Sequence, residues 1–162
     1  MINVKHKYLF HFSIFFSVII AQLYFPVIYI KEVSIQADII LLYITVISIL
    51  YGRFPGIVIG FIGGLLQDFM TQVELLGVFS LSKPIAAYII GSIFNYKSIW
   101  HIKIQYLVII ISYFIHFFIY FYLFSRPIFN LFYLAIFIII HSVILFILFL
   151  VLNSLVYKNK LL

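Results

Sequence analysis

The sequence predicts an all-α integral membrane protein, with about six transmembrane helices in a single polytopic domain, residues 1–162. Hydrophobic residues make up 67% of the chain, whereas a soluble domain has roughly 45–50%. Only 10 basic and 4 acidic residues are present, too few to cover a soluble enzyme with solvated groups or to keep a chain disordered. Because one bilayer crossing needs about 20 apolar residues, the length allows at most about six or seven crossings and no extramembrane domain.

Charged residues divide the hydrophobic sequence into runs that predict the spans. The first run, residues 8–30, follows Lys5-His6-Lys7 and lacks a small-x-small cleavage site, so we expect a retained span rather than a signal peptide. The last run is too short for two crossings, which favours one long or tilted helix. The predicted spans are 8–30, 34–51, 54–69, 76–94, 104–125 and 129–157.

Basic residues segregate to one side of these predicted spans, and this segregation predicts the orientation. The basic side holds both termini and carries Lys5, Lys7, Arg53, Lys97, Lys103, Lys158 and Lys160. The other side carries Lys31, Lys83 and Arg126 together with all four acids, Glu32, Asp38, Asp68 and Glu74. We therefore expect both termini in the cytoplasm. The basic residues form no continuous patch, so nucleic acid is not an expected partner.

Glycines recur at every fourth position in the third predicted span. Gly52, Gly56, Gly60 and Gly64 form this series, and Gly63 lies beside it. Small residues let helix backbones approach closely in lipid, where there is little hydrophobic drive for helices to associate. The series therefore predicts a helix-packing face. Packing inside this protein is the favoured interpretation, and contact with a span of another protein is the alternative.

Asp68 and Lys83 are the charged residues predicted to lie nearest the hydrocarbon. Asp68 ends the third span, where the helix dipole disfavours a carboxylate. Helical side chains lean toward their own N-terminus, so the two heads should converge in depth if the third and fourth spans are antiparallel neighbours. We predict an Asp68–Lys83 ion pair, with Glu74 as the rival partner for Lys83. Snorkelling of Lys83 and coordination of an ion or substrate are alternatives.

Two histidines, His116 and His141, fall near the middles of the last two spans. Neither span contains a carboxylate, which favours hydrogen bonds to tyrosine or backbone over metal binding or proton relay. Gln22, Gln67 and Asn95 are expected to form hydrogen bonds between helices.

The chain lacks the usual signatures of catalytic sites. It has no cysteine, no phosphate-binding glycine loop, no His-Glu-x-x-His and no Gly-x-Ser-x-Gly. No two carboxylates share a helix face at catalytic spacing. We therefore predict no catalytic, cofactor or metal site, and no enzymatic activity.

Residues 37–91 resemble the rod shape-determining protein MreD family. The resemblance rests on Ala37-Asp38-Ile39-Ile40-Leu41-Leu42-Tyr43, Gly52-Arg53, Gly56, Gly60-Phe61-Ile62-Gly63-Gly64-Leu65-Leu66-Gln67-Asp68, Leu76-Gly77, Leu81 and Tyr88-Ile89-Ile90-Gly91. This chain has Ala37 where that family usually has proline. Length and span number also agree, whereas the last two spans match only in hydrophobicity.

The resemblance implies a non-catalytic inner-membrane subunit of the bacterial cell-elongation machinery. Such a subunit binds MreC, a bitopic membrane protein, and helps to couple MreB to the wall synthases, RodA and a class B transpeptidase. The family is also similar in architecture to the substrate-binding subunits of energy-coupling-factor transporters. A vitamin-binding subunit of that class is therefore the alternative function, although the short outward loops count against it. An assembly factor for another membrane complex is a third interpretation.

Overall fold

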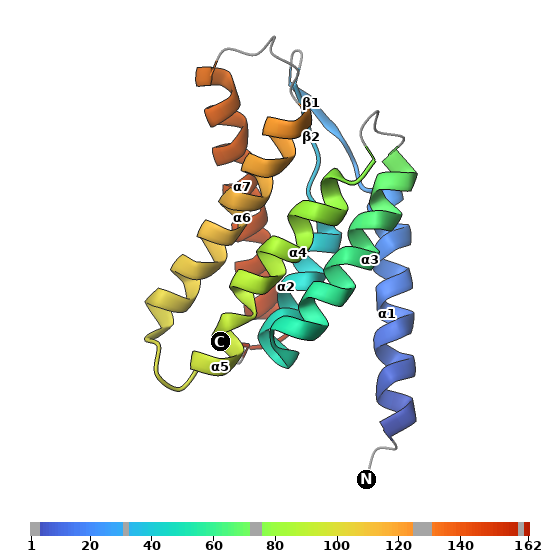
Figure 1. The fold of residues 1–162 in the computed structure, drawn as a ribbon, viewed down its shortest axis with the longest axis vertical. Helices are drawn as coiled ribbons and strands as arrows, with labels where there is room; N and C mark the ends of the chain where they lie inside the picture. Colours follow the sequence, from blue (N-terminus) through green and yellow to red (C-terminus); the bar gives the residue numbers. More distant parts are fainter. Residues whose placement is uncertain (1–3, 31–32, 72–75, 125–130, 159–160) are drawn as a thin grey trace.

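The computed structural model describes residues 4–30, 33–71, 76–124, 131–158 and 161–162, and these confirm an all-α membrane protein (Figure 1). Four helical segments are long and apolar enough to cross a membrane: Arg53–Thr71, Val78–Tyr96, Ile102–Leu123 and Phe132–Leu155. The helices are α1 (Val4–Tyr24), α2 (Ile39–Tyr51), α3 (Arg53–Thr71), α4 (Val78–Ile90), α5 (Ser92–Tyr96), α6 (Ile102–Phe124) and α7 (Leu131–Leu155). α4 and α5 together form one crossing, interrupted at Gly91, so the predicted number of helical segments is correct.

A short β-hairpin occupies the chain between the first two helices, where the sequence predicted the end of one span and the start of the next. Its strands are β1 (Ile28–Ile30) and β2 (Val33–Ile35), which pair antiparallel with Ile28 opposite Ile35. α1 ends at Tyr24 rather than at residue 30, because the residue before Pro26 is disfavoured in helical conformation. The predicted spans 8–30 and 34–51 therefore both extended too far toward this hairpin.

α2 is the central helix of the bundle, and it is short. Its 13 residues span about 20 Å at 1.5 Å per residue, less than the roughly 30 Å of bilayer hydrocarbon. Every residue from 40 to 49 is buried, as expected for a helix that is apolar all round. α2 therefore contacts protein rather than lipid over most of its length.

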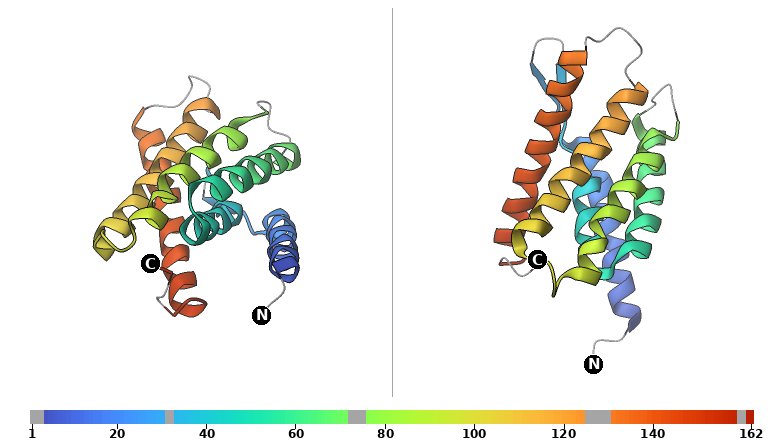
Figure 2. Two further views of the ribbon diagram at one scale, coloured as in Figure 1. Left: turned by 60° about the horizontal axis from the view of Figure 1, so that its bottom comes forward. Right: turned by 60° about the vertical axis from the view of Figure 1, so that its left-hand side comes forward.

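The two ends of the molecule differ in what they contain. The start of α1, α5 and the last two residues, 161–162, lie at one end, and the β-hairpin lies at the other (Figures 1 and 2). α3 and α6 begin at the terminal end, so Arg53 and Lys103 belong to it as well. A chain whose first described helix starts at the same end as its last residues requires an even number of crossings.

Candidate functional site

A buried cluster of charged side chains begins at the N-terminus of α2. Asp38 is the N-cap of this helix, and its Oδ1 accepts a hydrogen bond of 2.8 Å from the backbone N–H of Leu41. Aspartate is a preferred N-cap because its oxygen satisfies one of the unpaired N–H groups of the first turn. Since α2 begins inside the bundle, this local requirement places a carboxylate there, with Asp38 only 4% exposed.

Lys83 of α4 neutralises this carboxylate. The Lys83 ammonium forms an ion pair with Asp38 Oδ2, and the Lys83 side chain is fully buried. The pairing of Lys83 with Asp68 predicted from the sequence is therefore wrong. The sequence analysis placed Asp38 on the outer side of the membrane but gave it no partner. The local sequence does not indicate that α2 and α4 are in contact.

Asp68 instead caps the neighbouring helix. Its Oδ1 and Oδ2 accept hydrogen bonds of 3.0 Å each from the backbone N–H groups of Phe79 and Ser80, in the first turn of α4. The positive end of the α4 dipole and these donors stabilise the carboxylate, so it needs no lysine. Asp68 acts on Lys83 only through longer-range attraction. The rival partner, Glu74, lies outside the described residues.

The two histidines have different partners. His116 Nε2 lies 3.6 Å from Asp38 Oδ2, and neither nitrogen of the buried His116 ring has a hydrogen-bond partner. A carboxylate at the start of α2 thus lies near His116, although the helix of His116 contains none, and the sequence did not indicate this neighbour. His141 Nδ1–H donates to the Phe137 carbonyl oxygen at 2.9 Å, which is the expected backbone bond.

The glycines lie at contacts between helices of this chain. A Cβ on Gly60 would stand 3.2 Å from the backbone nitrogen of Pro84, and one on Gly64 would stand 2.7 Å from Ser80 Cα. Gly56 faces Ser48 of α2, and Gly63 faces Ile40 of α2 and Phe15 of α1. Gly52 ends α2 with φ of +89°, a conformation that side-chain-bearing residues rarely adopt.

These five glycines are all buried. They hold α3 against α4 and α2, and through these contacts fix Asp68 and Lys83 beside Asp38. Within the described residues, the glycine series is therefore an internal packing face.

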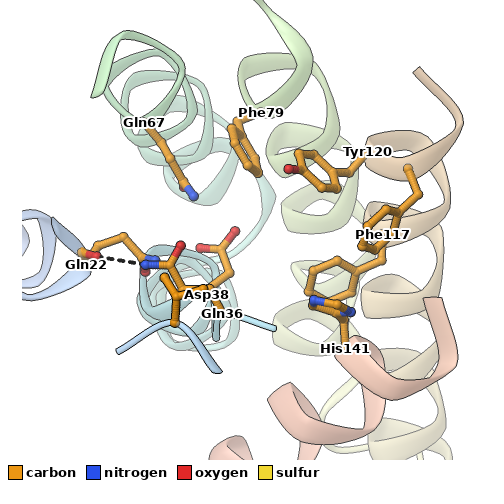
Figure 3. Close-up of a pocket in the computed structure, with 10 residues that line it drawn as sticks. Gln22, Gln36, Asp38, Gln67, Phe79, Phe117, Tyr120 and His141 are labelled. Carbon is orange, nitrogen blue, oxygen red and sulfur yellow. Dashed lines mark hydrogen bonds between the residues drawn. The ribbon is translucent and has the colours of Figure 1, made fainter. Parts of the chain in front are cut away.

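A cavity of about 310 Å³ lies beside the charged cluster, on the hairpin side of the bundle. Figure 3 shows its side chains pointing toward a common space from α1, α2, α3, α4, α6 and α7. The lining residues are Gln22, Val27, Gln36, Asp38, Gln67, Phe79, Phe117, Tyr120, Phe121 and His141. Sequence analysis singled out several of these residues separately, but no sequence pattern brings six segments to one cavity.

Two of the lining glutamines form hydrogen bonds with backbone groups of the cavity wall. Gln22 Nε2 donates to the Ala37 carbonyl at 3.1 Å, and Gln22 Oε1 accepts from the Ile39 N–H at 2.7 Å. Gln36 Nε2 donates to the carbonyls of Phe25 and Gln22. Gln22 thus joins α1 to the start of α2, as expected of it. Gln67 lines the cavity with its Oε1 unpartnered, and Asn95 is exposed at the other end of the bundle.

The charged groups beside the cavity and the potential metal ligands can be described together. The charged groups are committed to one another or to helix ends, and the part of the chain that the structure describes has no group of three or more potential metal ligands among His, Cys, Asp and Glu. The comparisons add no relative: no protein-family profile, curated protein or solved structure matches this chain.

Proposed function

We propose that this protein is a non-catalytic inner-membrane subunit of the bacterial cell-elongation machinery. In this role it binds an MreC-like bitopic membrane protein and helps to couple MreB to the wall synthases, RodA and a class B transpeptidase. The proposal rests on the resemblance of residues 37–91 to the MreD family.

One structural observation supports this proposal. The positions that carry the resemblance are those that assemble α2, α3 and α4 into a unit. Asp38 caps α2, Gly60 and Gly64 admit the α4 backbone, Asp68 caps α4, and Gly91 meets the start of α3 at Arg53. These positions all act within one three-helix unit, which makes the motif more specific than an equal number of scattered small residues.

The proposed orientation places both termini in the cytoplasm. The end that holds the termini also holds Arg53, Lys97 and Lys103, as the positive-inside rule requires of the cytoplasmic face. MreB is cytoplasmic and the large region of MreC is extracytoplasmic. A subunit with short described connections would therefore meet its partners within the membrane or at its two faces.

Two measurements on the full-length chain test this function. Depletion of the protein in its native host should convert rod-shaped cells to rounded cells. A tagged chain solubilised from that host should co-purify a protein with one N-terminal span and a β-rich exterior. Retention of rod shape on complete depletion, together with no such bitopic partner, would refute the proposal.

The cavity favours a second candidate, a vitamin-binding subunit of an energy-coupling-factor transporter. The short outward loops counted against this function in the sequence, but a cavity of about 310 Å³ falls at the lower end of the range for small-molecule sites. Co-purification separates the two functions, because an ATPase module and a retained vitamin should accompany a transporter subunit.

A further inference from the structure

We propose that Asp38, Lys83 and His116 form an acid-sensitive switch, in which the protonated His116 ring competes with the Lys83 ammonium for the Asp38 carboxylate. This inference goes beyond the proposed role in cell elongation and does not depend on it, because it follows from the placement of three buried side chains. The switch makes the packing of α4 on α2 responsive to acidity on the hairpin side of the membrane.

The Asp38 carboxylate offers one oxygen to two side chains. Oδ1 accepts the N–H of Leu41 at the start of α2. Oδ2 holds the Lys83 ammonium and also lies 3.6 Å from His116 Nε2. A neutral imidazole and an ammonium can both stand beside this oxygen, whereas an imidazolium and an ammonium repel each other in a buried site. Protonation of His116 therefore sets α6 and α4 in competition for the start of α2.

The His116 ring is placed so that a proton gives it partners. It is fully buried, and neither ring nitrogen makes a hydrogen bond of good geometry. Its ring lies against the rings of Phe79 and Phe117. An imidazolium donates from both nitrogens, and the Asp38 carboxylate and the Ser82 backbone carbonyl are acceptors that face the ring. A movement of a few tenths of an ångström would bring Nε2 within hydrogen-bond distance of Asp38.

His116 is also the group of this region whose charge change acts directly on the ion pair. Among the described residues, the ionisable groups around it are Asp38 of α2, Asp68 of α3, Lys83 of α4, Tyr113 and Tyr120 of α6, and His141 of α7. Histidine is the side chain whose charge ordinarily changes between about pH 5 and pH 8, which is the range that histidine switches use. His141 is bonded to the Phe137 carbonyl, and Asp68 is bonded to the start of α4.

The cavity gives water access to this cluster from the hairpin side. Val27 and Gln36, which flank the hairpin, line it, and Val27 is 36% exposed. The Asp38 carboxylate points into the cavity between the side chains of Gln67 and Tyr120 (Figure 3). A space of about 310 Å³ with polar side chains in its wall is large enough to hold water. Protons from that side therefore reach Asp38, and through it His116.

Melting temperatures of the purified full-length protein in detergent, measured between about pH 8 and about pH 5.5, test the switch. Protonation of His116 opposes the folded packing because it sets two cations on one oxygen, whereas the unfolded chain takes up the proton freely. Stability is therefore withdrawn as the pH falls through the ordinary histidine range. Over this range the wild type should lose about 3–6 °C more than His116→Gln, which keeps a polar side chain but cannot take up the proton.

The sign of this response should reverse in Lys83→Met. Without the ammonium, the imidazolium becomes a countercharge for Asp38, so protonation of His116 supports the folded packing. Acid should then raise the melting temperature of Lys83→Met by about 3–6 °C. The double variant His116→Gln/Lys83→Met should lack this rise. A rise that persists undiminished in the double variant would assign the effect to protonation of Asp38 itself and overturn the switch.

His141→Gln is the matched control. His141 is also a buried histidine beside the cavity, but its ring is bonded to the Phe137 carbonyl. Its replacement should leave the pH response of the wild type and of Lys83→Met unchanged. The inference is overturned if the wild type and His116→Gln respond alike to pH, or if His141→Gln removes the response instead. If Lys83→Met does not accumulate, the comparison of the wild type with His116→Gln decides alone.

Discussion

Replacement of the buried Asp38–Lys83 pair should show strong coupling between its two members. Lys83→Met keeps the length of the side chain but leaves the Asp38 carboxylate uncompensated, which should cost about 3–5 kcal/mol. Asp38→Asn strands the ammonium at a similar cost while keeping an oxygen to cap α2, because asparagine is as good an N-cap as aspartate. For a chain of 162 residues, such losses correspond to a fall in melting temperature of about 6–20 °C.

The double variant Asp38→Asn/Lys83→Met should recover most of this loss, because no uncompensated charge remains in the interior. The assay is the melting temperature of the detergent-solubilised protein, followed by size-exclusion chromatography of a fluorescent fusion. Lys97→Met is the control: the side-chain ammonium of this exposed lysine donates to the Leu161 carbonyl, and its loss should cost less than about 1 kcal/mol. If the two single effects simply add in the double variant, the pair is not coupled and the reasoning fails.

Three further predictions follow from the packing and the proposed orientation. Asp68→Ala should lower the free energy of unfolding by about 1–3 kcal/mol, because it leaves the N–H groups of Phe79 and Ser80 unpaired. Asp68→Asn should lower it less. Equal melting temperatures for Asp68→Ala and the wild type would contradict the capping role. Gly64→Leu should prevent accumulation of folded protein, because the α4 backbone occupies the space that the leucine side chain would need. Val58→Leu, on the exposed face of α3, is the control and should be tolerated. A wild-type yield of Gly64→Leu would rule out this contact. A fluorescent protein fused after Leu162 should be bright in the cytoplasm, and a dark fusion with an active periplasmic reporter at the same position would reverse the orientation.

The sequence predicts the helical class and the number of helices because each of these features depends on residues that are close together in the chain. Apolar runs bounded by charged residues such as Lys97 and Lys103 define segments, and regularly spaced glycines indicate close packing. Helix ends depend on shorter signals. Pro26 stops α1, and Asp38 starts α2 after the β-branched residues of β2, so the first two helices are shorter than their apolar runs.

The candidate site could not be predicted because its members come from different helices. Lys83 pairs with a carboxylate 45 positions away, and His116 meets that same carboxylate from a third helix. The helix dipole correctly predicted that the Asp68 carboxylate needs a positive partner. That partner is the N-terminus of α4 rather than a side chain. Hydropathy and spacing describe single helices, whereas this cluster is determined by how three helices are placed around α2.

The short length of α2 has a consequence for biogenesis. A 13-residue helix is too short to be stably inserted alone, and Gly52 by itself separates it from α3. We therefore expect α2 to leave the insertion machinery together with α3, as a helical pair whose polar end is incomplete until α4 arrives with Lys83. Translation up to α4 is then the earliest point at which the Asp38 carboxylate has its countercharge, and chains truncated before that point should be substrates for membrane quality control.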